Sequence, residues 1–260
     1  MRQISFYILL LLSAVFSANG EFLEIDSLKE MLPYIDQNSL LLLDIDNTLM
    51  EPVQSLGGDQ WFRHHKKELL QQGLSHNEAL EQSLRDWRAV QHLSKMQAVE
   101  DTTAEIVSRL QEEGYPLMGL TTRGLGMSTL TVQQLDSIGI DLHFTSPSHQ
   151  DVFFVNERGN LYHRGVLFTA GSHKGEALRL FLEQAEYHPK RVVFVNDKHS
   201  HIIPVEKTCL ELGIPFLGLR YSYLDEKVAH FQPEVAAVQW DQFGHILSDE
   251  EAQLQLTEIP

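Results

Sequence analysis

Two acidic residues, Asp44 and Asp46, stand one residue apart directly after the apolar run at residues 40–43. A continuous apolar run predicts a strand that is buried on both faces, and ligands bind at the carboxyl ends of such strands in open α/β sheets. Two carboxylates at one strand end repel each other, and a hard cation such as Mg2+, which takes oxygen ligands, relieves that repulsion. The pair therefore predicts a magnesium site. The simpler alternative is a strand followed by an Asp-Asn turn.

The segment Asp44-Ile45-Asp46-Asn47-Thr48 resembles the first signature of the haloacid dehalogenase-like (HAD) superfamily, which is Asp-x-Asp-x-Thr after a hydrophobic strand. The resemblance implies that Asp44 is the nucleophile that becomes an aspartyl-phosphate. It implies that Asp46 is the general acid/base found in the phosphatase branches. It also implies that Thr48 fixes the turn through which the backbone of Asp46 binds Mg2+.

Two later segments resemble the second and third signatures in the order in which the superfamily carries them. The apolar stretch 117–120 is followed by Thr121, Thr122 and Arg123. The resemblance assigns the phosphoryl-binding hydroxyl to Thr121, with Thr122 as the alternative, and we expect all three residues to bind the substrate. Lys174 begins a predicted helix, where its charge opposes the helix dipole. The resemblance implies that Lys174 balances the negative charge of the nucleophile and the phosphoryl group, both as a catalytic and as a substrate-binding residue.

Asp197 ends another apolar run and resembles the acid of the fourth signature. The implied metal ligands are then Asp44, Asp46 through its backbone carbonyl, and Asp197. Two residues depart from the pattern: Asn196 stands where many relatives have Gly or Asp, and His201 stands where a second acid often lies. A neutral side chain at either place weakens the outer support of a metal ion, so we expect weaker metal binding.

The composition suits a sizeable domain and makes some partners unlikely. The chain has 260 residues, 43% hydrophobic content and a formal net charge of −16. This length suits one sizeable domain, or a domain with a modest insertion. Nucleic acid and anionic membrane surfaces require a basic face, so we expect neither as a partner. A small anion remains compatible with the charge, because a local metal or lysine outweighs a diffuse acidic surface.

Residues 1–20 predict a secretory signal peptide. Arg2 supplies a positive charge, the apolar core at 6–16 is short for a membrane span, and small residues allow cleavage near Gly20. The alternative is an uncleaved membrane anchor. Cys209 is the only cysteine, so an intramolecular disulfide is impossible. We therefore expect an exported bacterial protein, periplasmic or secreted, with no stable membrane insertion after cleavage.

The remaining sequence predicts the elements that position these residues. Residues 50–100 predict a helical cap inserted between the first two signatures, with a capping box at Ser75-x-x-Glu78; the alternative is ordinary helices of the outer layers. Residues 21–49 and 101–260 predict the HAD-like core. Within the core we expect a strand at 140–144, a small β-hairpin around the turn at 157–160, and a short helix after the capping box at Ser248.

Together these patterns predict a three-layer α/β/α, Rossmann-like core with a mainly parallel sheet, plus the helical cap and the hairpin. The resemblance implies a Mg2+-dependent phosphohydrolase that acts on a small phosphate monoester through an aspartyl-phosphate. One alternative is a catalytically weak binding protein of the cell envelope, which Asn196 and His201 favour. Another is a dehalogenase, against which Asp46 argues because dehalogenases have no use for a second acid there. Beyond the signatures, the sequence resembles an exported bacterial HAD-like family of unknown function (DUF2608-like).

Overall fold

The structure is a computed structural model that describes residues 21–242. The predicted signal peptide and its cleavage site, and the helix predicted after Ser248, lie outside these residues. Among the helices of the described part, none combines the length and the apolar character needed to cross a membrane.

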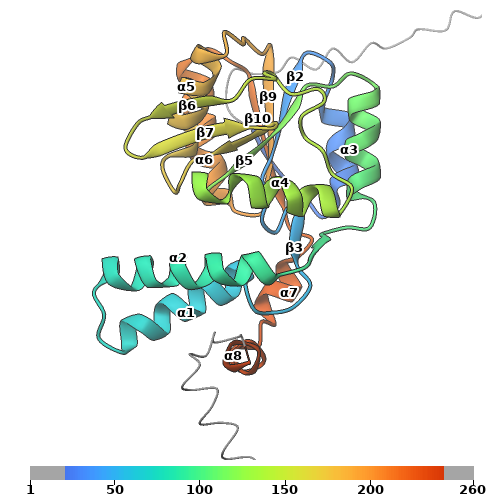
Figure 1. Cartoon of the computed structure of the whole chain (residues 1–260). Coiled ribbons are helices and arrows are strands. Elements are labelled where there is room, and N and C mark those ends of the chain that lie inside the picture. Colours follow the sequence, from blue (N-terminus) through green and yellow to red (C-terminus); the bar gives the residue numbers. More distant parts are fainter. Residues whose placement is uncertain (1–20, 243–260) are drawn as a thin grey trace, which may run out of the picture.

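An eight-stranded sheet forms the centre of the core, in the order β1-β10-β9-β2-β5-β8-β7-β6 (Figure 1). The strands are β1 (Glu21–Ile25), β2 (Ser39–Leu43), β5 (Leu117–Thr121), β6 (Val152–Val155), β7 (Gly159–His163), β8 (Val166–Phe168), β9 (Arg191–Asn196) and β10 (Phe216–Tyr221). Neighbouring strands from β1 to β8 are parallel, whereas β7 pairs antiparallel with both β8 and β6. The sheet is therefore mainly parallel, as predicted, with an antiparallel margin.

Helices cover both faces of the sheet. Side chains of β2 alternate between the two faces, so Leu41 and Leu43 pack in one apolar cluster while Leu40 and Leu42 pack in the other. The helices are η1 (Leu28–Tyr34), α3 (Thr103–Glu112), η2 (Leu125–Met127), α4 (Ser128–Ser137), α5 (Lys174–Gln184) and α6 (His199–Glu211). Residues of η1, α3 and α4 join the first cluster, and residues of α5 and α6, including the buried Cys209, join the second. The predicted three-layer α/β/α class is confirmed.

Two local predictions in the second half of the core need correction. The segment 140–144 is not a strand, because β8 pairs directly with β5 and no strand of the described sheet pairs with this segment. Ile140 and Leu142 nevertheless remain buried, which explains their apolar character. The predicted hairpin is present as β6 and β7. From the sequence we expected its second arm to run from Leu161 to Phe168, but the chain turns at Arg164 and Gly165, which have positive φ angles of 48° and 78°. That turn creates β8 and places it beside β5.

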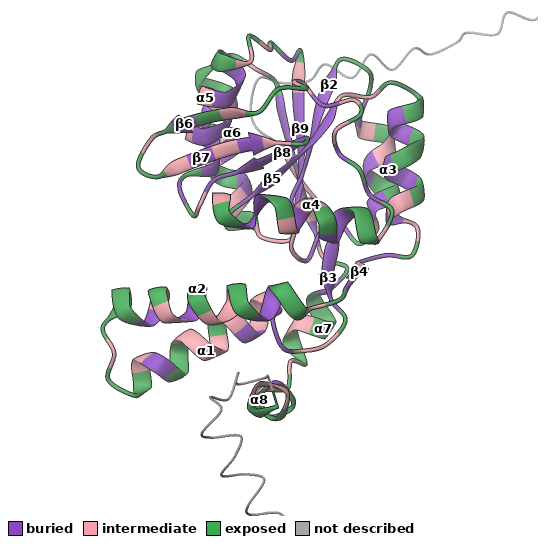
Figure 2. Ribbon diagram, in the orientation of Figure 1, coloured by how far each residue is buried: buried purple, intermediate pink, exposed green. Residues whose placement is uncertain are grey.

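The predicted insertion is a pair of helices, α1 (Asp59–Gln71) and α2 (His76–Leu93), joined to the core by the antiparallel strands β3 (Met50–Pro52) and β4 (Met96–Ala98). Ser75 and Glu78 form the expected capping box at the start of α2. In Figure 2 the strands of the core are largely buried, whereas the helices of the insertion expose much of their surface. We call β3 and β4 the stalk.

The end of the described chain returns to the insertion. Helix α7 (Asp225–Ala229) follows β10, and α8 (Pro233–Asp241) lies beside the insertion (Figure 1). Ala236 of α8 is fully buried in a small cluster with Leu56, Trp61 and Val90. The backbone N–H of Leu56 also donates to Oε1 of Gln239 over 2.9 Å. Helix α8, which we assigned to the core from the sequence, thus shares an apolar cluster with the insertion.

Helices α5 and α6 approach each other closely at Gly175. A Cβ atom on Gly175 would lie 2.1 Å from the carbonyl oxygen of Pro204 and 2.4 Å from Oγ1 of Thr208. We therefore expect Gly175→Ala to lower the free energy of unfolding by about 2 kcal/mol or more, because the helices must separate to admit the methyl group. Urea unfolding measures this change. Gly126→Ala is the control, since a Cβ on Gly126 would meet nothing within 4 Å. Equal stability of the two variants would contradict the prediction.

Candidate active site

The carboxyl ends of three neighbouring parallel strands carry predicted site residues. Strand β2 lies between β9 and β5, so Asp44, Asp197 and Thr121 lie at the same edge of the sheet. Lys174 is the first residue of α5, and its side chain reaches Asp44. The four segments that resemble the signatures are thus brought together, although they are spread over more than half of the chain.

Asp44 and Lys174 form a buried ion pair. Nζ of Lys174 donates to Oδ1 of Asp44 over 2.8 Å, and the two side chains are only 3% and 8% exposed, respectively. The backbone N–H of Asp44 donates to the carbonyl oxygen of Val195 in β9, which holds the end of β2 in place. Nζ of Lys174 also lies 5.4 Å from the ring centroid of Phe194. Because an unpaired charge is costly at this depth, each of the two charged groups fixes the position of the other.

Asp46 is held by Arg123. Nη2 of Arg123 donates to Oδ1 of Asp46 over 2.7 Å, and Nε donates to Oδ2 over 2.9 Å. Burial acts to raise the pKa of Asp46, but the Arg123 guanidinium, assisted by Lys198 and Lys174, holds that pKa below its usual value. Asp46 is therefore a carboxylate at neutral pH, oriented by two charge-assisted hydrogen bonds.

The guanidinium of Arg123 is fully engaged by protein acceptors. Nη1 donates to Oγ1 of Thr131 and to Oε1 of Gln134, and Nη2 also donates to Oε1 of Gln91. With the two bonds to Asp46, these contacts occupy all five N–H donors of the group. Arg123 consequently links Asp46 to helix α4 in the core and to helix α2 in the insertion.

The two threonines after β5 lie in different environments. Thr121 is 1% exposed, and its Oγ1 accepts a hydrogen bond from the backbone N–H of Arg123 over 3.1 Å. Its own hydroxyl proton is available for a bond to a phosphoryl oxygen, because a hydroxyl can accept and donate at once. Thr122 is exposed and lines a cavity next to Asp46. The geometry favours Thr121 for the phosphoryl contact and Thr122 for the wall of the cavity.

Asp197 has an unsatisfied carboxylate oxygen. Oδ2 lies 3.4 Å from Nδ2 of Asn47, whereas Oδ1 is buried without a hydrogen-bond partner. Burial raises the pKa of Asp197 to about 7. The positive charge of Lys198 lowers this pKa, whereas repulsion from Asp44 and Asp59 raises it further. A divalent cation would compensate this acid, since it supplies both the missing contact and the missing positive charge.

The oxygen atoms near Asp44 and Asp197 fit a Mg2+ ion if one of its protein ligands is a backbone carbonyl. Among residues 21–242, no group of three or more His, Cys, Asp and Glu side chains is arranged to hold a metal ion. Asp44 and Asp197 supply two side-chain carboxylates, and the carbonyl oxygen of Asp46 is the third protein ligand that the resemblance implies. Mg2+ commonly keeps several waters and needs only one or two carboxylates, so this small oxygen set is chemically sufficient.

The two departures from the superfamily pattern both lie close to the site, Asn196 fully buried and His201 half-buried. Oδ1 of Asn196 accepts from the backbone N–H of Lys198 over 2.8 Å, which shapes the turn after β9, while its Nδ2 has no hydrogen-bond partner. Nδ1 of His201 is likewise buried without a partner. Asn196 is therefore explained as a turn residue, and His201 stands near Lys174 as a neutral side chain.

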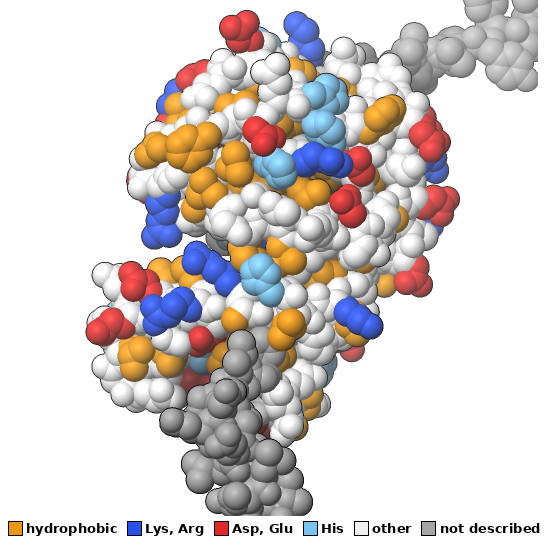
Figure 3. All heavy atoms as spheres, viewed as in Figure 1, with side chains coloured by type: hydrophobic (Ala, Val, Ile, Leu, Met, Phe, Trp, Pro, Cys, Tyr) orange, Lys and Arg blue, Asp and Glu red, His pale blue; other side chains and the backbone are white. Residues whose placement is uncertain are grey.

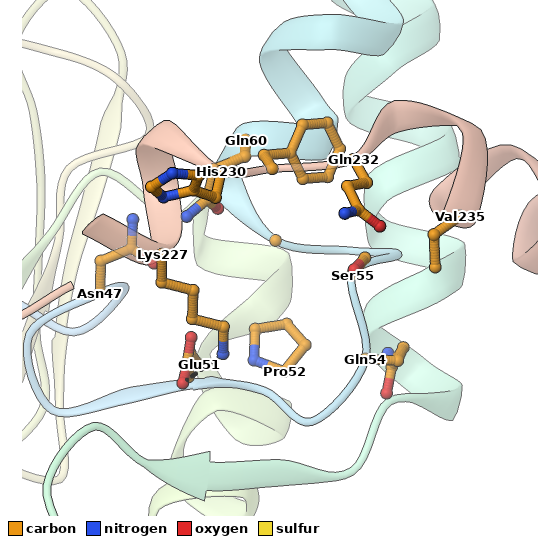
Figure 4. A pocket seen from close by; sticks show the side chains of 12 residues that line it. Asn47, Glu51, Pro52, Gln54, Ser55, Gln60, Lys227, His230, Gln232 and Val235 are labelled. Carbon is orange, nitrogen blue, oxygen red and sulfur yellow. Dashed lines mark hydrogen bonds and ion pairs between the residues drawn. The ribbon is translucent and has the colours of Figure 1, made fainter. Parts of the chain in front are cut away.

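Two cavities lie near the candidate catalytic residues. The insertion cavity, of about 110 Å³, lies between the insertion and the segment after β5 and is lined by Asp46, Asp59, Phe62, Leu84, Trp87, Arg88, Thr122, Arg123, Gly124 and Met127. The stalk cavity, of about 200 Å³, lies against the stalk and the link between α7 and α8 (Figure 4). Its lining is rich in amides, and its charged pair, Lys227 and Glu51, is joined over 2.7 Å. On the face shown in Figure 3, acidic and basic side chains are interspersed.

Comparison with known proteins identifies the family. Residues 23–253 match a family model described as "Protein of unknown function (DUF2608)". The chain belongs to the DUF2608 family. Two relatives, each named "Putative outer membrane protein", come from Chlamydia pneumoniae and Chlamydia muridarum; each is 27% identical over 259 residues and covers 98% of both chains. A solved haloacid dehalogenase-like family hydrolase from Streptococcus pneumoniae is 15% identical, with a TM-score of 0.44, over 75% of this chain and 98% of that chain.

This DUF2608 protein has site residues that sequence reasoning did not single out. Oδ1 of Asp59, in the first turn of α1, accepts from Nζ of Lys198 over 2.9 Å and so joins the insertion to the core directly after Asp197. The ring centroid of Trp87 lies 5.1 Å from the guanidinium carbon of Arg123. Both contacts join segments that are distant in the sequence, so no local pattern announces them; the position of Lys198 beside a predicted metal ligand was the one available signal.

We expect the half-buried His201 of this DUF2608 protein to lower the stability of the fold in acid. Burial, assisted by the positive charge of Lys174, lowers the pKa of His201 to about 4 from the usual 6.5. Between these values the unfolded chain binds a proton at His201 that the folded chain does not bind. The free energy of unfolding is therefore undiminished by His201 above about pH 6.5, and it falls as the pH decreases toward about 4. In EDTA, we therefore expect the Tm of wild type to decrease more between about pH 7 and about pH 5 than that of His201→Gln.

The control for this prediction is His76→Gln, because His76 is exposed at the start of α2. Its Tm decrease should equal that of wild type. The raised pKa of Asp197 acts in the opposite direction, since the folded state there binds the extra proton, and it is common to all three proteins. An equal decrease for wild type and His201→Gln would show that His201 does not carry the acid sensitivity.

Proposed function

We propose that this protein is a Mg2+-dependent phosphohydrolase that cleaves a small phosphate monoester through an aspartyl-phosphate on Asp44. The observation that carries the proposal is the buried pair of Asp44 and Lys174, 2.8 Å apart, beside the unsatisfied oxygen of Asp197. A carboxylate nucleophile, a fixed cation for the phosphoryl oxygens and an unsatisfied acid for a metal are the groups that this chemistry requires. Their convergence from three distant segments supports it.

The first chemical step uses the two oxygens of Asp44 differently. Mg2+, held by Asp44, Asp197 and the carbonyl of Asp46, would neutralise charge on the phosphate. Lys174 engages Oδ1 of Asp44, which leaves Oδ2 for attack on phosphorus. A bond forms between Asp44 and phosphorus while the bond to the leaving oxygen breaks. The hydroxyl of Thr121 and the ammonium of Lys174 donate to the phosphoryl oxygens as their charge develops.

Asp46 moves protons in both steps. In its protonated form Asp46 gives a proton to the leaving oxygen and becomes a carboxylate. The carboxylate then removes a proton from the water that attacks the aspartyl-phosphate, which releases inorganic phosphate, frees Asp44 and restores the protonated Asp46 for the next turnover. The two hydrogen bonds from Arg123 favour the carboxylate form of Asp46, which is the form that acts as a base. They disfavour the protonated form, which is the form that acts as an acid. Because all five N–H donors of Arg123 are occupied, we assign it a positioning role on Asp46 in place of the predicted contact with substrate.

The second candidate function is that of a HAD-like binding protein with little turnover. The observations that favour it are the neutral, partly unsatisfied side chains of Asn196 and His201, which give the metal site less outer support than acids would. The dehalogenase alternative is less favoured, because Asp46 is held in place beside the nucleophile by two hydrogen bonds, an arrangement that a dehalogenase does not need.

We also propose that the protein acts in the cell envelope. The predicted signal peptide at residues 1–20 supports export, and the names of the two chlamydial relatives refer to the outer membrane. A periplasmic or secreted phosphatase would meet small phosphate esters there, and the acidic net charge of −16 argues against nucleic acid as its substrate.

A panel of small phosphate monoesters and 2-haloacids, with Mg2+ or with EDTA, tests the proposal. We expect phosphate release from a generic ester such as p-nitrophenyl phosphate only with Mg2+, and no halide release. Replacement by Ca2+ should inhibit, because its longer bonds and larger ligand number draw both oxygens of Asp44 to the metal. Equal rates with the two ions would contradict this geometry. Mg2+ binding by calorimetry without turnover of any ester would favour the binding protein.

A further inference from the structure

The insertion cavity has walls suited to a flat apolar group. Phe62, Leu84 and Trp87 of the insertion face Met127 of the core across it, and these four side chains supply its apolar lining. Asp46 and Thr122 also line the cavity, so whatever fills it lies next to the proposed proton-transfer group. The cavity is therefore placed where the leaving group of a phosphate ester would lie.

The aromatic wall is held in a fixed orientation. Nε1 of Trp87 donates to the carbonyl oxygen of Gly57 over 2.9 Å, and the Arg123 guanidinium carbon lies 5.1 Å from the ring centroid. The guanidinium is itself fixed by its bonds to Asp46 and to Gln91. An indole with its N–H satisfied and one side against a fixed cation offers a preorganised surface, which lowers the cost of ordering a bound ring.

Of the charged side chains that line the insertion cavity, one cation has no ion-pair partner among the described residues. Asp46 is paired with Arg123, and Asp59 is paired with Lys198 over 2.9 Å and with Arg63 over 3.0 Å. Arg88, by contrast, is exposed at the cavity and has no hydrogen bond or ion pair within residues 21–242.

The guanidinium of Arg88 stands over the segment that follows β5. Its Nη2 would lie 3.8 Å from a Cβ placed on Gly124, the residue after Arg123. An unpaired guanidinium beside a partly enclosed apolar cavity favours a ligand that carries an anionic group, because such a group gains charge-assisted hydrogen bonds there.

The size of the cavity limits the ring. An engineered apolar cavity of about 150 Å³ binds benzene, so a partly open space of about 110 Å³ suits one ring better than a fused bicycle with an attached sugar. Alkyl phosphates would leave the aromatic wall unused, and a sugar would meet mainly apolar side chains. These comparisons favour a single-ring ester over nucleotides and sugar phosphates.

We propose that the substrate is a phosphate monoester whose leaving group is a single aromatic ring bearing a second anionic group. The ring lies against Trp87 and Phe62, and the second anion binds Arg88. This inference rests on the proposed phosphohydrolase function for turnover, while the binding preference follows from the cavity itself.

Hydrolysis tests the second anion. Wild-type protein with Mg2+ is assayed on phenyl phosphate and on its 3-carboxy and 4-carboxy derivatives. We expect kcat/KM to be about tenfold higher for at least one carboxylated ester, which is the size of a charge-assisted hydrogen bond, and this ratio to fall to about one in Arg88→Gln. Arg85→Gln is the matched control, because Arg85 is exposed on the same helix, bonds to Gln82 and does not line the cavity. It should keep the wild-type ratio.

Binding of non-hydrolysable phosphonates separates this inference from the proposed function. With Mg2+ present, calorimetry should show about tenfold tighter binding of phenylphosphonate than of methylphosphonate, because burial of a ring is worth at least that much. A carboxyphenylphosphonate should bind more tightly again, and only Arg88→Gln should remove that gain. If no ester is hydrolysed but the phosphonates bind in this order of affinity, the phosphohydrolase proposal fails, while the proposed class of ligand, an aromatic ring with a second anion, is supported. Equal binding of methyl and phenyl compounds, or no dependence on Arg88, would overturn the ligand class.

Discussion

Replacement of Asp44 by asparagine is expected to lower the rate of phosphate release by at least about 10³-fold. The carboxamide is nearly isosteric with the carboxylate but is a poor nucleophile, so the aspartyl-phosphate cannot form. The Oδ1 atom of an asparagine can still accept a hydrogen bond from Lys174, which should preserve the local packing. Phosphate release from p-nitrophenyl phosphate with Mg2+ measures the effect, and circular dichroism with a thermal melt checks the fold.

Asp101→Asn provides the matched control for Asp44→Asn, because Asp101 is exposed and lies outside the site. It should retain the wild-type rate. If Asp44→Asn keeps more than a few per cent of that rate while remaining folded, Asp44 is not the nucleophile. Trapping of a phosphorylated protein in wild type, and its absence in Asp44→Asn, would support the aspartyl-phosphate directly.

The second large effect is expected at Lys174. Lys174→Gln removes the cation that holds Oδ1 of Asp44 and that would meet the phosphoryl oxygens, so kcat should decrease about 10²-fold to 10³-fold, as it does on loss of one preorganised donor. Stability should also decrease, because the Asp44 carboxylate would remain 8% exposed without its cation. Steady-state kinetics and urea unfolding measure the two effects on the same preparation.

Lys207→Gln is the control, since its side chain is 73% exposed and its pair with Glu211 spans 3.9 Å. A surface pair of this kind is worth little, so neither kcat nor stability should change. A folded Lys174→Gln protein with the wild-type kcat would remove Lys174 from the mechanism. Loss of stability with unchanged kcat would leave it only a structural role.

Sequence patterns predicted the strands of the site well because their signal is local. The apolar runs of β2 and β9 are buried on both faces of a parallel sheet, and each ends at an acid that the chain places at the sheet edge. The capping box at Ser75 marked the start of α2 for the same reason. The segment 140–144 misled this reasoning, because its buried residues pack in the core without pairing to a strand, and apolar character alone does not distinguish the two.

The pairing of the charged side chains could not be read in the same way. Arg123 was expected to bind substrate, yet its donors are taken by Asp46, Gln91, Thr131 and Gln134, which lie between 8 and 77 residues away in the chain. The contact of Asp59 with Lys198 likewise depends on how the insertion lies over the core. Such choices follow from the distance between groups and from the cost of burying an unpaired charge, which only the folded chain defines.

The sequence by itself determined the α/β class, the order of the signature segments and the identity of Asp44, Asp46, Thr121, Lys174 and Asp197 as candidates. The class and the strand and helix ends follow from neighbouring residues, which encode burial and caps, whereas the resemblance to the superfamily signatures is what singled out these five residues. Only the tertiary structure decided that Arg123 positions Asp46, that α8 packs on the insertion, and that Trp87 and Arg88 border a cavity beside the site. The physical reason is that these features arise from contacts between segments far apart in the chain, whose partners are chosen by shape and charge after the elements have packed.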